Sequence, residues 1–135
     1  MAYQFSTSAR NASLDAIETA IGVSAILRLR SGAAPANCGA ADSGTVLATM
    51  NLPSDWLANA SGGAKALSGT WQDLAADAAG TVGHFRIYDS TGVTCHIQGT
   101  VTITGSGGDM TIDNPALTTG QQVNVTAFSI TAGGA

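Results

Sequence analysis

The chain has 135 residues and a formal net charge of −4, a size that suits one domain able to bury a core without disulfides or metals. Only 10% of the residues are charged, against about a quarter in typical soluble domains. Since such a chain has no basic patch to neutralise phosphates, its composition argues against nucleic acid and against an anionic membrane surface as partners.

The first ten residues, 1–10, are polar apart from Tyr3 and Phe5. Chain ends of this kind are loosely held unless a contact fixes them, so we expect an N-terminal arm followed by a single domain over residues 11–135. The sequence lacks the basic-then-apolar pattern of a signal peptide and any apolar run of membrane-spanning length. We therefore expect synthesis and folding in a cytoplasm.

A short amphipathic helix is predicted over residues 11–21, where apolar residues recur at helical spacing: Leu14, Ile17 and Ile21. Asn11 or Ser13 is the expected N-cap, and Gly22 is expected to end the helix. Two roles are open for this helix. It could close one end of a β core, or it could dock on a neighbouring subunit.

Alternating residues then predict strands over residues 24–30 and 45–52, joined by a long loop of small residues, 31–44. Arg28 and Arg30 are expected on a solvated face of the first strand. Loops of this length without regular structure tend to be functional or mobile.

Two tryptophans mark the weakly patterned stretch from residue 54 to residue 79. A turn of helix is expected near Ser54, and a short strand near residues 70–74. Trp71 is expected in the core or at its rim. For Trp56, which precedes Leu57, a core position and an exposed interface anchor are both open.

Residues 83–105 predict a β-hairpin, since two alternating apolar and polar runs flank a Ser/Thr/Gly turn. The favoured register has a three-residue loop, 90–92, with Gly92 at a positive φ. It pairs apolar with apolar residues and polar with polar residues: Phe85 with Ile97, Ile87 with Cys95, Arg86 with His96 and Tyr88 with Thr94.

A second hairpin is predicted where the chain turns at Gly105–Gly108 and returns through Met110 and Ile112. The last strand is expected over residues 123–131, with a bulge near Ala127 because the apolar phase changes there. Seven or eight short strands with frequent turn signals and one helix predict an all-β, mainly antiparallel domain of the β-sandwich or jelly-roll type.

No constellation of residues predicts catalysis or a cofactor. His84 and His96 are expected on the surface, and no third ligand at a characteristic spacing joins them to make a zinc site. Cys38 and Cys95 are expected as free thiols, Cys95 as a small core residue; a disulfide between them is the alternative. We therefore expect a protein that is not an enzyme and has no metal or cofactor.

Three runs of the sequence, 11–21, 26–56 and 83–113, resemble a family of small structural proteins of tailed bacteriophages and prophages, especially the head decoration or capsid cement proteins. The resemblance implies a virion protein that binds the outside of the capsid shell and stabilises it. Its implied partners are the major capsid protein and further copies of itself, as a dimer or trimer. The alternative is a tail or fibre component that binds a host surface or carbohydrate.

A shell-binding protein needs residues that contact its neighbours. The candidates are apolar residues of the N-terminal arm, the helix and the stretch with the first tryptophan: Tyr3, Phe5, Leu14, Ile17, Trp56 and Leu57. Few charges and many small residues lower the desolvation cost of broad contact surfaces.

Overall fold

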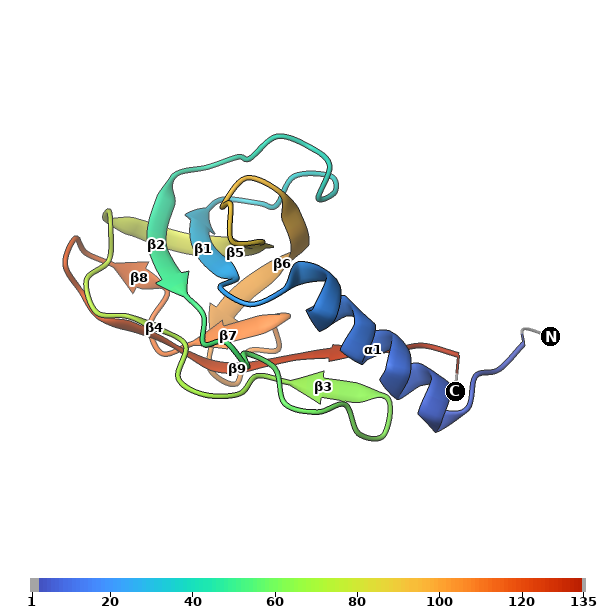
Figure 1. The fold of residues 1–135 in the computed structure, drawn as a ribbon. Coiled ribbons are helices and arrows are strands. Elements are labelled where there is room, and N and C mark those ends of the chain that lie inside the picture. The colour runs from blue at the N-terminus through green and yellow to red at the C-terminus, as the bar shows by residue number, and fades with distance from the viewer. Residues whose placement is uncertain (1–2, 135) are drawn as a thin grey trace.

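A computed structural model describes residues 3–134 of the chain. One helix, α1 (Thr7–Ile21), precedes a β-rich remainder (Figure 1). The strands are β1 (Ile26–Ser31), β2 (Val46–Asn51), β3 (Ala64–Ala66), β4 (Gln72–Asp73), β5 (Gly80–Tyr88), β6 (Cys95–Ile103), β7 (Met110–Ile112), β8 (Ala116–Leu117) and β9 (Val123–Thr131). The predicted all-β class with one short N-terminal helix is confirmed.

The strands belong to one curled, mixed sheet that forms a half-barrel, where separate sandwich layers were expected. Its order is β2-β1-β5-β6-β7-β9-β3, with β4 paired to β9 and β8 paired to β5. All the pairs are antiparallel except β6 with β7. The curl lets one continuous sheet enclose a core, as two facing layers would do.

The helix starts four residues earlier than predicted. Ser6 is the N-cap, because its hydroxyl accepts a hydrogen bond from the Ala9 N–H at 3.1 Å. Asn11, one predicted cap, instead accepts a hydrogen bond from the Gly63 N–H at 2.8 Å. The helix ends as expected at Gly22, whose φ is +86° and whose N–H donates to the Glu18 carbonyl. Part of the predicted arm is therefore helical.

The central hairpin is confirmed, but its register differs from the predicted one. Ile87 pairs with Ile97 and Phe85 with Gly99, two residues along from the expected partners. A two-residue shift keeps every side chain on its face, so Phe85 and Ile87 are buried as predicted. Gly92 adopts the expected positive φ, +70°.

An irregularity next to the turn changes which residues of β6 face the core. Ile87 pairs with Ile97, but the next residue, Tyr88, pairs with Cys95, so one extra residue lies in β6 between these pairs. The alternation reverses there. Cys95 is consequently half-buried beside Tyr88, so its predicted core position is wrong, and Val93 is 80% exposed.

The predicted second hairpin is wrong, because β7 runs parallel to β6. Val101 pairs with Met110 and Ile103 with Ile112. Parallel neighbours usually require a connection of a dozen or more residues, yet here the chain loops back and resumes the direction of β6 within residues 104–109. Gly105 (φ +87°) and Gly107 (φ +83°) supply the backbone conformations that such a tight connection needs.

The last strand, β9, has the predicted bounds and the predicted bulge. Thr111 pairs with Ala127 and Ile112 with Val125, so Thr126 is the extra residue. Phe128 then points into the core alongside the earlier Val125. The expected short strand near residues 70–74 is present as β4, whereas residues 54–55 form a turn and not the expected helix.

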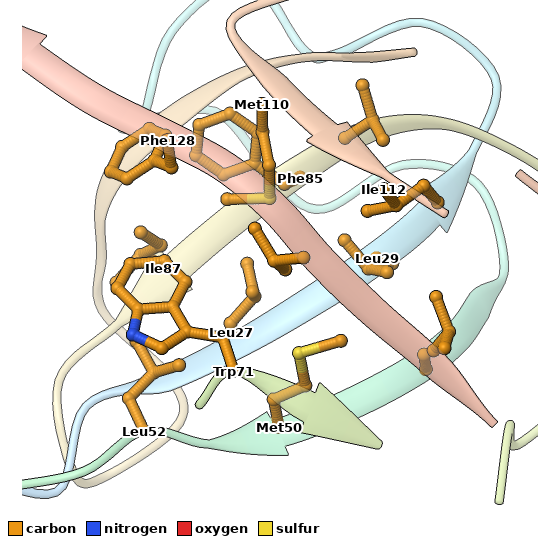
Figure 2. Close-up of a cluster of buried hydrophobic side chains, with 14 of the residues drawn as sticks. Leu27, Leu29, Met50, Leu52, Trp71, Phe85, Ile87, Met110, Ile112 and Phe128 are labelled. Atoms are coloured by element: carbon orange, nitrogen blue, oxygen red, sulfur yellow. The ribbon is translucent and has the colours of Figure 1, made fainter. Parts of the chain in front are cut away.

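The core fills the inside of the curled sheet (Figure 2). Phe128 packs against Trp71 at 5.6 Å between ring centroids and edge-on against Phe85 at 5.3 Å. Leu27 and Leu29 of β1 and residues of the other strands complete it: Met50, Leu52, Ile87, Met110 and Ile112. The prediction of Trp71 in the core is confirmed.

Candidate functional site

The N-terminal segment presents two exposed aromatic side chains. Tyr3 is 79% exposed and Phe5 50% exposed, and their rings meet edge-to-face with centroids 5.3 Å apart. The Phe5 N–H donates to the Gly134 carbonyl, so this segment lies against the residues that follow β9. Both predicted interface residues of the arm are therefore accessible.

A shallow cavity of about 310 Å³ adjoins Phe5. It is lined by the first turns of α1 and by the residues after β9: Ala9, Arg10, Ser13, Ala132 and Gly133. The buried Arg10 Nε has no hydrogen-bond partner among the described residues, although an Arg10 Nη donates to Thr7 Oγ1 at 3.3 Å. Aromatic, small and cationic groups thus meet at this end of the molecule.

The two helix residues predicted for the interface differ in exposure. Ile17 is 40% exposed, whereas Leu14 is only 1% exposed and packs inward with Ile21. Leu14 is therefore wrong as an interface residue. Leu14, Ile17 and Ile21 share one helix face by their spacing, with Ile17 at its accessible edge and the other two packed inward. The helix thus packs on the β core and leaves Ile17 open to a neighbouring subunit.

Trp56 and Leu57 are fully buried, so both are wrong as exposed interface residues. The indole N–H of Trp56 donates to the Gly22 carbonyl at 3.2 Å, and its ring lies 5.9 Å from that of Trp71. Leu57 forms a bridge with Leu67. These residues join the C-terminal end of α1 to the core, because the helix end supplies a carbonyl for the buried indole.

A buried lysine fixes the helix to the sheet. Lys65, in β3, is 2% exposed and its Nζ lies 2.6 Å from Asp15 Oδ1 and 2.9 Å from Glu18 Oε1, both on α1. Burial lowers the Lys65 pKa, but hydrogen bonds to Asp15 and Glu18 outweigh it and raise the pKa above 10.5. Glu18 also accepts the Leu57 N–H at 3.1 Å. The helix is therefore held as a rigid part of the domain.

A polar cluster lies where the polar faces of β1 and β5 meet the loop 32–44. Arg86 is 2% exposed and Arg30 7% exposed. The predicted solvated position is therefore wrong for Arg30, whereas Arg28 is half-buried. Asp42, in that loop, accepts hydrogen bonds from Arg30 (3.0 Å), from Arg86 and from the Tyr88 hydroxyl (2.7 Å). One carboxylate thus ties the loop to two strands.

Arg86 also uses its remaining donors. Its Nε donates to Gln98 Oε1 at 3.1 Å, and one Nη donates to three loop carbonyls, those of Asn37, Cys38 and Ala40, at 3.1–3.2 Å. A buried guanidinium with partners for its donors is stable where an unpaired one would be costly. The loop is therefore ordered by the arginine beneath it.

The charges of the cluster reinforce one another. Burial raises the pKa of Asp42, but the hydrogen bonds from Tyr88 and Arg86 and the nearby Arg30 outweigh it and hold the pKa below its ordinary 3.8. Burial and the hydrogen bond to Asp42 raise the pKa of Tyr88. The carboxylate is consequently ionised and the phenol neutral at physiological pH, the states that the hydrogen bonds require.

The two histidines differ. His84 is fully buried, so its predicted surface position is wrong, and its Nδ1 lies 2.8 Å from the Gly32 carbonyl, which can only accept. Residue 83 must be glycine here, since a Cβ would come within 2.2 Å of that carbonyl. His96 is exposed as predicted, and its Nε2 lies 3.5 Å from Asp89 Oδ2.

Within residues 3–134, His, Cys, Asp and Glu side chains do not gather in any group of three or more that could hold a metal ion. Over the same residues, the structure contains no helix long and apolar enough to cross a membrane. Cys38 and Cys95 are free thiols, as predicted. Among the residues predicted for the interface, Tyr3, Phe5 and Ile17 are the accessible ones.

Comparison with known proteins identifies no relative. No protein-family model matches the chain, and neither a curated protein nor a solved structure matches it significantly. The resemblance to phage proteins therefore stays a prediction.

Proposed function

We propose that the chain is a non-enzymatic structural protein of a tailed-phage virion that binds the outside of the capsid shell and stabilises it. The observation that carries this proposal is the exposed aromatic pair Tyr3 and Phe5 on a segment held in place at both sides. Phe5 is bonded to the C-terminal segment, and the helix that follows is fixed by Lys65. Ordered apolar side chains bind partners at a lower entropic cost than mobile ones.

The proposed contact surface consists of Tyr3, Phe5 and Ile17. These residues are 79%, 50% and 40% exposed in the isolated chain. Aromatic anchors contribute much of the binding energy of protein interfaces. The buried candidates Leu14, Trp56 and Leu57 are not part of this surface.

Self-association as a dimer or trimer is part of the proposal, and it would use side chains and not strand addition. Both terminal strands of the sheet are already covered. The Leu47 carbonyl of β2 accepts the Asp77 N–H at 2.8 Å, and the Ala66 carbonyl of β3 accepts the Ala58 N–H at 2.8 Å. Covered edges also suit a protein that must remain soluble before assembly.

The carbohydrate-binding alternative has less support. It needs an exposed aromatic platform, and both tryptophans, Trp56 and Trp71, are buried. The exposed aromatic residues in the described chain are Tyr3 and Phe5, whose rings meet edge-on and do not form a flat stacking surface.

A reconstruction of virions from the phage or prophage that carries this gene tests the proposal. We expect density for the half-barrel at the junctions between capsomers, in many copies per head. Density confined to the tail, or virions that lack the protein, would contradict it.

A binding assay locates the surface. We expect Phe5→Ser to lose co-sedimentation with shells of the major capsid protein while its thermal unfolding stays unchanged. Val93→Ser is the matched control, because it also replaces an exposed apolar residue by serine. Val93 is 80% accessible and lies at the hairpin turn. Equal binding by both variants would exclude the Tyr3 and Phe5 surface.

A further inference from the structure

The only two cysteines of the chain line one cavity, although they are 57 positions apart in the sequence. The cavity has a volume of about 530 Å³ and lies between the loop 32–44 and the start of β6. Its lining includes Cys38 and Asp42 from the loop, Arg86 from β5, and Thr94 and Cys95 from the hairpin. Two thiols from segments far apart in the sequence thus line the same cavity.

The cluster already described fixes the backbone on the Cys38 side of this cavity. The Cys38 carbonyl accepts a hydrogen bond from Arg86 at 3.1 Å, which fixes the backbone that carries this thiol. The Cys95 thiol donates weakly to the Ile97 carbonyl at 3.5 Å and also interacts with the Cys38 thiol. Neither cysteine is bonded, and each is partly accessible to solvent. Two accessible thiols on the same cavity can be crosslinked when their Cα atoms come within disulfide range.

We propose that Cys38 and Cys95 form a reversible intramolecular disulfide that locks the loop 32–44 onto β6 when the surroundings become oxidising. The site is independent of the proposed capsid-binding surface, since it involves neither Tyr3, Phe5 nor Ile17.

The oxidant is a small disulfide such as oxidised glutathione. The Cys38 thiol loses its proton to solvent, and its thiolate attacks one sulfur of the oxidant. The oxidant's S–S bond breaks, one glutathione thiolate leaves, and a mixed disulfide remains on Cys38. The Cys95 thiolate then attacks the Cys38 sulfur and expels the second glutathione. The protein loses two electrons and two protons, and the oxidant becomes two thiols.

The environment of Cys95 assigns the order of these steps. Burial, together with the interaction with Cys38, raises the pKa of Cys95 to about 12. A thiol that stays protonated near neutral pH is a poor first nucleophile. Cys38 therefore attacks the oxidant first and Cys95 resolves the mixed disulfide, so closure accelerates as the pH rises.

Oxidation of the folded protein with oxidised glutathione, followed by intact-mass measurement and alkylation with N-ethylmaleimide, tests the proposal. We expect the native protein to lose two hydrogens, to become resistant to alkylation at both cysteines, and to yield a crosslinked peptide containing Cys38 and Cys95. Its thermal midpoint should rise, and dithiothreitol should restore the original mass and midpoint.

The single variants distinguish a pair from two separate thiols. Cys95→Ser should stop at a stable glutathione adduct on Cys38, whereas Cys38→Ser should react much more slowly. Serine is nearly isosteric at these half-buried positions, so both variants should fold. A native protein that accumulates one glutathione on each cysteine, or that forms only intermolecular disulfides, would overturn the proposal.

Discussion

The two faces of the β1–β5 strand pair are built from alternating residues of the same strands but are stabilised differently. One face carries Leu29 and Phe85, which are buried in a dry core. The other carries Arg30 and Arg86, which are buried as deeply, at 7% and 2% exposure, beneath the loop 32–44. Apolar packing holds the first face, and hydrogen bonds to one carboxylate and several carbonyls hold the second.

The alternation of apolar and polar residues in a strand therefore shows which residues share a face. It does not show whether that face is exposed to water. The apolar face is stabilised by area removed from water, which depends little on orientation. The polar face depends on donors and acceptors being matched, because an unmatched buried charge is costly. The two faces should therefore respond differently to substitutions of neighbouring residues.

Truncation on the apolar face should have the largest effect. Phe85→Ala removes a ring that is 1% exposed and packs edge-on against Phe128. The lost burial and the remaining cavity should lower the free energy of unfolding by about 4 kcal/mol. Urea denaturation monitored by tryptophan fluorescence measures this loss. An effect below that of Arg86→Met would reverse the ranking of the two faces.

The neighbouring residue, Arg86, tests the polar face. Arg86→Met preserves much of the side-chain volume but leaves Asp42 without one cationic partner and three loop carbonyls without their donor. We expect the free energy of unfolding to fall by about 3 kcal/mol. The loss should be smaller than for Phe85→Ala, because Asp42 is partly accessible and can recover some hydration.

Arg86→Met should also loosen the loop 32–44 itself. Phe85→Ala should not do so when the two variants are compared at the same free energy of unfolding. Limited proteolysis under native conditions should cleave within residues 32–44 faster in Arg86→Met than in the unaltered protein. Unchanged cleavage would mean that the loop holds its position without the arginine.

Local patterns were sufficient for much of the fold. The helix end at Gly22, the positive φ at Gly92, the core face of Phe85 and Ile87, and the whole of β9 with its bulge follow from spacing and from glycine's backbone freedom. Each of these features depends on residues close together in the sequence.

The features that were missed depend on distant segments. The burial of Arg86 requires the loop 32–44, and the burial of Trp56 requires the Gly22 carbonyl. The parallel pairing of β7 with β6 depends on the connection 104–109, which is shorter than the crossover that parallel strands usually need. The exposed residues of the candidate site, Tyr3, Phe5 and Ile17, were identifiable from sequence, but the hydrophobicity of Leu14, Trp56 and Leu57 could not separate an interface from a core.

A smaller effect, which depends on pH, is expected at Asp42. Asp42→Asn can keep an acceptor for Tyr88 and Arg86, but it replaces the oxygen that faces Arg30 by an NH2 donor and removes the negative charge. We therefore expect the free energy of unfolding to fall by about 2 kcal/mol at neutral pH. The folded pKa of Asp42 lies below its ordinary 3.8. Its charge therefore adds stability that is complete above this ordinary value and disappears as the pH falls through the folded pKa.

Urea denaturation at a series of pH values measures this dependence. The difference in stability between the unaltered protein and Asp42→Asn should be constant near neutral pH and should narrow below pH 3.8. Asp55→Asn is the control, since Asp55 belongs to no ion pair in the described residues. A constant difference at all pH values would show that the charge of Asp42 is not what stabilises the cluster.

Substitution of Arg28 should have the smallest effect on stability. It tests whether an arginine stabilises the fold because it is buried or only because it lies on the polar face. It lies on the same face as Arg86 but is only half-buried; its guanidinium is 4.8 Å from the Tyr88 ring centroid and donates to the Gly92 carbonyl at 2.7 Å. Water can replace both contacts, so Arg28→Met should lower the free energy of unfolding by only about 0.5–1 kcal/mol. If Arg28→Met lowers the free energy of unfolding as much as Arg86→Met does, burial beneath the loop 32–44 does not explain why the polar face stabilises the fold.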